Sequence, residues 1–318
     1  MRSYLKYLKG DPVIWIITLL MMAFSLVTVY SFVPILIKIE GGSPFLYLFK
    51  HLVYVVLGFG AMFVIHRVPA KYISQLAKFA YYLGLALLLF TWFFGAEVNG
   101  AGRWIRIPFV NLTFQSSDFA KLALIIYLSK LLVRKQQKFD NWKEGIFPLL
   151  IPIGLTCFLI LKDNFSTAAM LFLLSMIMLF IGRVPLLKLL TLAGIGVGIV
   201  VLVVGAHLTF PDANILPRYD TWMNRINNRV DATNQSVESL QANQQANNAK
   251  LAISVGSVFG QGVGDGKLKE FLPEAYADFY YATFVEEFGS GAALVLVFLY
   301  LILLYRMIRI SLKTTDLF

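Results

Sequence analysis

The sequence predicts an all-α polytopic membrane protein, and three observations carry this prediction. Of the 318 residues, 58% are hydrophobic and only 14% are charged, whereas a soluble domain carries about 25% charged residues. The mean hydropathy is +0.71. The apolar residues gather in unbroken runs close to the roughly 20 residues that a helix needs to cross a bilayer. They do not alternate with polar residues as the strands of an outer-membrane barrel do.

Eight apolar runs are expected to form membrane-spanning helices. They lie at about 13–36, 45–66, 73–95, 115–133, 146–162, 165–183, 186–209 and 279–305. Only KDN at 162–164 separates the fifth and sixth runs, so these two should form a tight hairpin. We expect one transmembrane domain over 1–318, with long loops at 96–114 and 210–278. Because Cys157 is the single cysteine, an internal disulfide is excluded.

The basic residues of the short loops predict the orientation, because cytoplasmic loops are enriched in Lys and Arg. If the N-terminus is cytoplasmic, the short outer turns hold only Lys38 and Lys162. The inner segments then hold Arg2, Lys6, Lys9, Arg67, Lys71, Lys130, Arg134, Lys135, Lys138, Lys143, Arg183, Lys188, Arg306, Arg309 and Lys313. Most of the net charge of +10 is therefore explained by basic loop residues that set the orientation in the membrane. We expect no nucleic-acid partner. Both long loops should be extracytoplasmic.

The second long loop contains an amphipathic segment at about 217–230, followed by a Gln/Asn-rich stretch at 234–250 that we expect to be mobile. Helical spacing places five apolar residues on one face: Tyr219, Trp222, Met223, Ile226 and Val230. Arg218, Arg225 and Arg229 flank or oppose this face. Two interpretations stay open: a plain interfacial anchor, or arginines that attract a lipid-linked phosphate or pyrophosphate.

Charged residues inside the fourth and eighth runs indicate function or a structural network, because ionised side chains are costly in a bilayer. Asp118 and Lys121 share one helical face. Lys121 would lie roughly 9 Å deep, and Glu286 and Glu287 roughly 10–12 Å deep, at 1.5 Å per residue. From these matched depths we expect Lys121 to pair with one of the two glutamates. The network either holds helices together or lines a substrate cavity.

Two further carboxylates precede the eighth run at the outer lip of the membrane. Asp278 comes directly before the run, and Glu274 lies one helical turn earlier. Asp278 is either an acid that stabilises a helix N-terminus or a general base at the boundary between membrane and water. Glycines at 256, 260, 262, 264 and 266 precede both. They predict a compact loop that needs positive φ or a close backbone approach.

Three motifs follow one another at 99–132, 162–170 and 259–289, and together they resemble those of the SEDS family (shape, elongation, division and sporulation). NGAGRWIRIPFVNLTFQSSDFAKLALIIYLSKLL at 99–132 is similar to its Gly-x-x-Arg-Trp segment followed by Gln-Pro-Ser-Glu-x-x-Lys. KDNFSTAAM at 162–170 resembles its Asp-x-(Gly/Ser)-Thr-Ala hairpin. FGQGVGDGKLKEFLPEAYADFYYATFVEEFG at 259–289 resembles its glycine-rich loop with Leu-Pro-Glu, Thr-Asp-Phe and Glu-Glu-x-Gly. LKGDPVIW and the Phe-Gly-x-x-x-Asn-Gly segment favour the division member over the elongation member.

The sequence departs from the family pattern at several places. Ser116 replaces a proline, Asp118 replaces a glutamate, and YAD at 276–278 stands where His-Thr-Asp is usual. The family has ten spans, whereas eight are found here before the sequence stops at SLKTTDLF. We therefore expect a chain that is truncated at its C-terminus relative to the family.

The resemblance implies a polytopic GT-C-type peptidoglycan glycosyltransferase that polymerises lipid II with inversion. Asp278 would be the catalytic base for the 4-hydroxyl of the acceptor. Substrate-binding cations would be Arg103, Lys121, Arg218 and Arg225, while Asp118, Glu286, Glu287 and Glu274 would form a structural or cavity network. The leaving pyrophosphate needs cations or a metal ion such as Mg²⁺, and no organic cofactor is expected.

The same resemblance implies a class B penicillin-binding transpeptidase and divisome membrane proteins as partners, at the septum in the cytoplasmic (inner) membrane of a bacterium. Two other functions remain alternatives: a lipid II flippase and a non-catalytic division scaffold. A flippase needs a polar route through the whole bilayer. The intramembrane charges cluster in the predicted outer half, which favours chemistry at the outer face.

Overall fold

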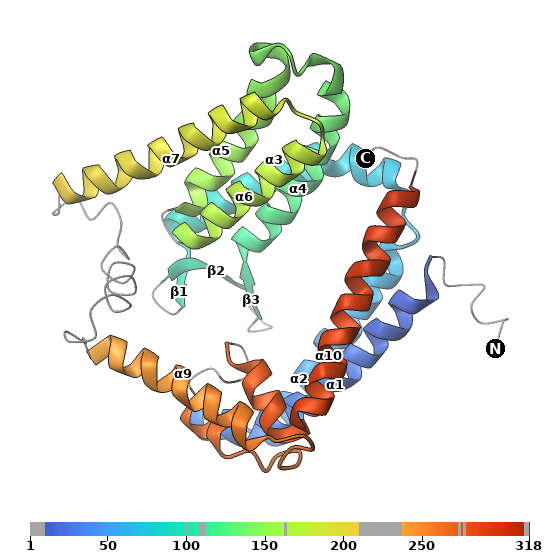
Figure 1. The fold of residues 1–318 in the computed structure, drawn as a ribbon, viewed down its shortest axis with the longest axis vertical. Helices are drawn as coiled ribbons and strands as arrows, with labels where there is room; N and C mark the ends of the chain where they lie inside the picture. The colour runs from blue at the N-terminus through green and yellow to red at the C-terminus, as the bar shows by residue number, and fades with distance from the viewer. Residues whose placement is uncertain are drawn as a thin grey trace. The chain divides into compact units, whose positions relative to one another are not determined.

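The computed structural model describes residues 10–98, 101–107, 112–161, 164–209, 237–272, 275, 278–314 and 318. Helices dominate it, and one small sheet interrupts them (Figure 1). The elements are α1 (Pro12–Glu40), α2 (Pro44–Ile65), α3 (Ala70–Phe94), β1 (Ala96–Val98), β2 (Ala101–Ile107), β3 (Leu112–Gln115), α4 (Ser116–Lys135), the 3₁₀ turn η2 (Gln136–Lys138), the π-helical turn η3 (Trp142–Ile146), α5 (Phe147–Leu161), α6 (Phe165–Ile181), α7 (Leu186–Thr209), α9 (Val237–Val255), the 3₁₀ turn η5 (Leu268–Phe271) and α10 (Tyr280–Lys313).

The predicted polytopic helical fold is confirmed, since a helix lies at each of the eight predicted apolar runs. Within the described residues, six helices are long and apolar enough to cross a membrane. α6 is apolar but shorter. α4 has 20 residues but is less apolar than the other spans, because it carries Asp118, Lys121, Lys130, Arg134 and Lys135.

Side-chain caps fix where several of these helices begin. Asp11 accepts a hydrogen bond from the amide of Val13 at the start of α1 (2.9 Å). Ser43 accepts one from Leu46 at the start of α2, and Asn164 one from Thr167 at the start of α6. Each cap satisfies an amide that has no partner inside the helix. The short connections between spans are therefore specified locally by single polar residues.

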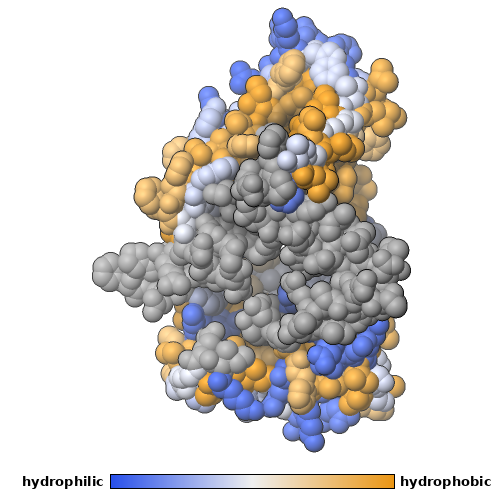
Figure 2. All heavy atoms as spheres, turned by 90° about the vertical axis from the view of Figure 1, so that its left-hand side faces the viewer, coloured by the Kyte–Doolittle hydropathy of each residue, from blue (hydrophilic) through white to orange (hydrophobic). Residues whose placement is uncertain are grey.

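The outer faces of the helices are apolar, as expected for helices that contact lipid. α2 has no buried residue at all, although its sequence is almost entirely hydrophobic. Figure 2 shows hydrophobic residues, in orange, over much of the described surface on the face drawn. A water-soluble monomer rarely exposes apolar surface on this scale, so the surface independently supports a multi-pass membrane protein.

The chain divides into two compact units. Unit 1 comprises 1–67 and 221–315, and unit 2 comprises 68–220 and 316–318. In unit 2, α3 to α7 pack around two apolar clusters, one near Leu128 and Leu149 and the other near Tyr81 and Leu124. In unit 1, α1, α2, α9, η5 and α10 pack on one another. The prediction of one transmembrane domain stays a prediction.

The first long loop, 96–114, contains a sheet that the sequence analysis did not predict. The sheet is antiparallel with strand order β1-β2-β3, and β2 aligns Trp104 with Gln115 and Ile107 with Leu112 of β3. β2 also packs against α3 and α4. The all-α description therefore holds for the spans, while this loop is a small β structure placed at the start of α4.

The Gln/Asn-rich stretch at 234–250 was expected to be mobile. This expectation is corrected, because the chain is helical from Val237 onward. α9 packs against α10 and η5 in unit 1, and Ala252 is fully buried. Ala249, three residues earlier on the same helical face, packs against the cluster of Phe32, Leu272 and Ala275. Small side chains at these two positions let a polar helix pack closely on its neighbours.

Candidate active site

The eighth span is broken, which changes how its carboxylates are placed. Gly289 has φ 82° and ψ 165°, so α10 consists of a short helix up to Phe288 and a long one from Ser290. The long part, Ser290 to Lys313, measures about 36 Å at 1.5 Å per residue, enough to cross a hydrocarbon core of about 30 Å. The depths expected for Glu286 and Glu287 assumed an unbroken helix from 279, and the break at Gly289 contradicts that assumption.

Loop 256–262 closes the break with backbone hydrogen bonds. Regular helical bonds cannot cross a residue with the conformation of Gly289. The loop supplies both the donors and the acceptors that the break requires. The four bonds are Gln261 N to Glu286 O (2.8 Å), Gly262 N to Glu287 O (3.1 Å), Ser290 N to Ser257 O (2.9 Å) and Gly291 N to Val258 O (3.2 Å).

The glycine-rich loop needs its glycines, as the sequence analysis predicted. Gly260, Gly262 and Gly264 have positive φ. A Cβ at Gly256 would collide with the carbonyl of Val285, and one at Gly289 with the carbonyl of Val258. The close approach of loop and helix therefore depends on the absence of these side chains.

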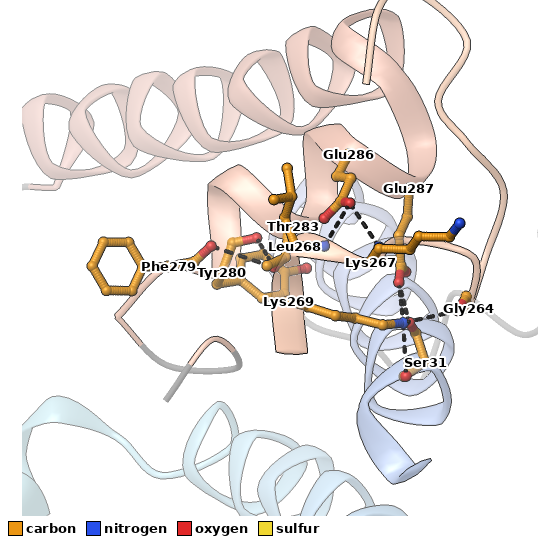
Figure 3. Close-up of polar contacts among 10 residues, drawn as sticks. All are labelled: Ser31, Gly264, Lys267, Leu268, Lys269, Phe279, Tyr280, Thr283, Glu286 and Glu287. Atoms are coloured by element: carbon orange, nitrogen blue, oxygen red, sulfur yellow. Dashed lines mark hydrogen bonds and ion pairs between the residues drawn. The ribbon is translucent and has the colours of Figure 1, made fainter. Parts of the chain in front are cut away.

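A buried ion pair links the loop to the broken helix. Lys269 Nζ lies 2.5 Å from Glu287 Oε1, and the two side chains are only 4% and 2% exposed. Ser31 of α1 donates its hydroxyl to the same carboxylate oxygen. Lys269 also donates to Ser31 Oγ (2.7 Å), Ser31 O (3.1 Å) and Gly264 O (3.1 Å). Figure 3 shows these four residues, which we call the Lys269 cluster.

Glu286 has a different set of partners, all from the backbone. Its Oε1 accepts from the amides of Lys267 (2.8 Å) and Leu268 (2.9 Å), at the start of η5 (Figure 3). The residue is 2% exposed. Its Oε2 has no hydrogen-bond partner among the described residues. Glu286 therefore fixes the turn of the loop, whereas Glu287 neutralises a buried lysine.

Asp278 lies in the turn directly before α10 and is exposed. The residues around it are held in place: Leu272 and Ala275 are buried against Phe32 of α1, and Phe279 packs on the same cluster. Of the three carboxylates in 272–289 that the structure describes, Asp278 alone reaches solvent. It is thus the one that a substrate could approach directly.

In unit 2, Lys121 pairs with Asp118 on its own helix. Their Nζ and Oδ1 atoms are 2.7 Å apart, and the side chains are 32% and 60% exposed. The expected pairing of Lys121 with Glu286 or Glu287 is corrected accordingly, because Glu287 has Lys269 and Glu286 has two amides as partners. Three-residue spacing on a helix already gives Lys121 a nearby carboxylate.

The remaining predicted site residues are described only in part. Arg103 lies on β2, and its side chain lies outside the described part of the structure. Arg218, Arg225, Glu274 and the amphipathic segment 217–230 lie outside the described residues altogether. Among the residues that are described, no three His, Cys, Asp or Glu side chains gather closely enough to hold a metal ion. The divalent cation stays a prediction.

Lys269 and Ser31 are the site residues that the sequence analysis missed. Lys269 belongs to the run KLKEF within an otherwise ordinary surface loop, and nothing in the spacing separates it from Lys267. Ser31 is one hydroxyl inside an apolar span. The only usable signal was the pair of adjacent glutamates, which needs at least one buried cation as a partner.

The sequence profile of the FtsW/RodA/SpoVE family, described as cell cycle proteins, matches residues 11–318. The chain belongs to this family. The predicted SEDS resemblance is thereby confirmed over nearly the whole chain.

Family members with similar sequences carry a shared name. The "probable peptidoglycan glycosyltransferase FtsW" of Geobacter sp. strain M18 is 30% identical over 314 residues, covering 97% of this chain and 80% of that protein. Proteins of the same name are 31% identical over 316 residues in Geobacter metallireducens (97% and 79% covered) and 29% identical over 310 residues in Coxiella burnetii (96% and 79% covered).

Two solved structures share the fold. A chain of a peptidoglycan synthase complex, described as coordinating polymerization and crosslinking, aligns with a TM-score of 0.65 at 20% identity, covering 98% of this chain and 80% of that chain. The rod shape determining protein RodA of Thermus thermophilus aligns with a TM-score of 0.61 at 20% identity, covering 98% and 78%. At this identity the likeness establishes the fold.

Proposed function

We propose that this chain is a peptidoglycan glycosyltransferase that polymerises lipid II at the outer face of the bacterial cytoplasmic membrane. Family membership and the shared name of its relatives support the reaction class. The observation that carries the assignment to a residue is the exposure of Asp278, at the start of a broken helix whose other described carboxylates are buried and engaged.

In the proposed reaction, Asp278 accepts the proton of the 4-hydroxyl of the acceptor GlcNAc. The oxygen attacks C1 of the donor MurNAc, and the C1–O bond to the lipid pyrophosphate breaks with its electron pair on the leaving group. One displacement inverts the anomeric centre. A carboxylate within hydrogen-bond reach of a hydroxyl contributes about 10²–10⁴-fold to such a step.

The buried glutamates are poor candidates for this base. Glu287 shares one oxygen with Lys269 and Ser31, and Glu286 holds two amides. Taking up a proton would weaken these charge-assisted bonds, which are stronger than neutral ones. Neither side chain reaches solvent, so neither could contact a sugar hydroxyl without moving the loop.

Four basic residues remain the candidates for stabilising the leaving pyrophosphate: Arg103, Lys121, Arg218 and Arg225. Charge that develops on the leaving oxygens is stabilised best by cations fixed in advance. Lys121 supports this role because its side chain is partly exposed at the N-terminal end of α4. A helix N-terminus itself favours anions.

The cellular setting is proposed on the same basis. The uniform Lys/Arg bias supports a cytoplasmic N-terminus, which would place Asp278 outside. Relatives named FtsW support division at the septum over elongation. One structural relative belongs to a synthase complex that couples polymerization to crosslinking. We therefore propose a class B penicillin-binding transpeptidase, together with divisome membrane proteins, as partners.

Reconstitution in liposomes with fluorescent lipid II tests the proposal against its two alternatives. A polymerase yields glycan chains on a gel and inverts the anomeric centre. A flippase moves label across the bilayer without polymer, and a scaffold does neither. We expect polymer when the transpeptidase partner is included, and translocation without polymer would overturn the assignment.

A further inference from the structure

We propose that Lys269 is a positioning residue for Asp278, which it holds in register through Glu287 of α10 and through the Ser31–Phe32 turn of α1. This inference rests on the proposed function, because it assigns Lys269 a part in the reaction of Asp278. Lys269 touches no substrate. Its contacts determine the position of the turn before α10 that carries Asp278.

The contacts of the Lys269 ammonium leave it no capacity for another ligand. A lysine has three N–H donors, and here four acceptors surround them: Ser31 Oγ, Ser31 O, Gly264 O and Glu287 Oε1, all within 3.1 Å. The side chain is also almost fully buried. A pyrophosphate could therefore not be its partner, and the lysine acts within the protein.

These contacts join three segments that are distant in the sequence. Ser31 belongs to α1, Gly264 and Lys269 to the glycine-rich loop and the η5 turn that directly follows it, and Glu287 to the short helix of α10 (Figure 3). The backbone bonds at the Gly289 break join the loop to the helix a second time. α1 is joined to this assembly at Ser31 through three buried hydrogen bonds, and one turn earlier through a longer contact between the hydroxyls of Thr28 and Tyr280 (3.4 Å).

The residue after Ser31 connects the cluster to the turn of Asp278. Phe32 is buried against Leu272 and Ala275, and Phe279 packs on the same cluster. The Lys269 ammonium also lies 6.0 Å from the centroid of the Phe32 ring. Consecutive residues of α1 thus hold the lysine on one side and the residues that flank Asp278 on the other.

Loss of the ammonium should therefore displace the turn rather than unfold it. Leu272, Ala275 and Phe279 would keep their apolar contacts, but their register on α1 would no longer be fixed by a directional bond. A displacement of about 1 Å in a catalytic group can cost about 10²-fold in rate. Binding of lipid II, which involves other residues, should be largely unaffected.

The kinetic test compares Lys269→Met with a matched control on the same two elements. Lys38 of α1 pairs with Glu270 of η5 at 2.9 Å, but the two side chains are 65% and 50% exposed. With the full chain and its transpeptidase partner, we expect Lys269→Met to lower kcat by about 10- to 100-fold at unchanged KM. Lys38→Met should leave both constants unchanged.

A double-mutant cycle with Asp278→Asn separates positioning from a general structural effect. If Lys269 acts through Asp278, Lys269→Met should cost little further rate once Asp278 is already Asn. If the two losses multiply, Lys269 does not act through Asp278, and the inference fails while the proposed function stands. If Asp278→Asn alone keeps the parent rate, the proposed function fails first.

Two further measurements keep the inference testable whatever the folding yield of the single variant. The double variant Lys269→Met/Glu287→Met leaves no unpaired buried charge, so it should show the parent Tm and still the low kcat. Hydrogen exchange can be measured without activity. The amide of Ala275 donates to Leu272 O in the turn, and that of Thr283 donates to Phe279 O at the start of α10; both should exchange faster in the double variant than in Lys38→Met. Parent-like exchange with a parent-like kcat would overturn the inference.

Discussion

Asp278 and Glu287 belong to one short segment, yet their surroundings suit them to opposite tasks. Glu287 is buried, faces a lysine and accepts a serine hydroxyl. Asp278 is exposed in a turn whose neighbours are anchored on Phe32. A general base needs access to its substrate, whereas a buried carboxylate needs partners. Burial, rather than residue type, thus separates the proposed catalytic carboxylate from the structural ones.

At the same scale, Gly289 predicts a test of the helix break. Gly289→Ala should destabilise the protein by about 1–3 kcal/mol or more, because φ 82° with ψ 165° is a conformation almost restricted to glycine and a Cβ would press on the Val258 carbonyl. Thermal unfolding in detergent measures the effect. Gly58→Ala in α2 is the control, since nothing lies near its added Cβ and it should be neutral or slightly stabilising. Equal Tm values for the two variants would contradict the break.

At the scale of elements, a loop and a helix complete each other. The loop 256–262 supplies the backbone bonds that the broken α10 lacks, and η5 supplies the amides that Glu286 needs. α1 adds the serine of the Lys269 cluster. None of these segments would satisfy its own polar groups alone, so they should order together.

A stability cycle tests which helices the buried charges connect. Lys269→Met should cost about 3–5 kcal/mol because it leaves Glu287 buried without its cation, whereas replacing both residues by Met should be far milder. Lys121→Met should cost at most about 1 kcal/mol, since its pair with Asp118 is largely exposed. Equilibrium unfolding in mixed micelles measures all of these variants.

The coupling energies distinguish the structure from the pairing expected on sequence grounds. Lys269→Met and Glu287→Gln should be strongly non-additive, while Lys121→Met and Glu287→Gln should add within about 0.5 kcal/mol. Strong coupling between Lys121 and Glu287, with none between Lys269 and Glu287, would show that the ion pair has been assigned to the wrong lysine.

For the whole molecule, hydropathy was enough to locate the helices at the eight predicted apolar runs because such segments are specified locally by composition. The sheet at 96–115 was missed although Asn-Gly at 99–100 is a hairpin-turn signal and Trp104, Ile105 and Ile107 are residues that favour strands. The break at Gly289 was missed because a glycine in an apolar run is common in membrane helices. The partner of Glu287 was missed because Lys269 and Ser31 come from other segments of the chain. The residue spacing within the eighth run does not show which segments fold back against it.

The orientation of the whole chain is a separate prediction. In a Cys157-free background, a cysteine at Ser236 should react with an impermeant thiol reagent on intact cells, and one at Gln136 should not. The reason is the Lys/Arg bias of the segments predicted to be cytoplasmic. Labelling at 136 without labelling at 236 would reverse the topology and remove Asp278 from the outer face.

The central claim is that Asp278 is the base of a lipid II polymerase, and the polymerisation rate of Asp278→Asn measures it most directly. The variant keeps the shape of the side chain but loses its basicity. We expect polymerisation to fall by about 10²–10⁴-fold with normal membrane insertion and Tm. Asp265→Asn, an exposed aspartate of the same glycine-rich loop, should keep the parent rate, and Glu274→Gln should be milder than Asp278→Asn. A parent rate in Asp278→Asn with a loss in Glu274→Gln would identify the other carboxylate as the base, and parent rates in both would contradict the mechanism.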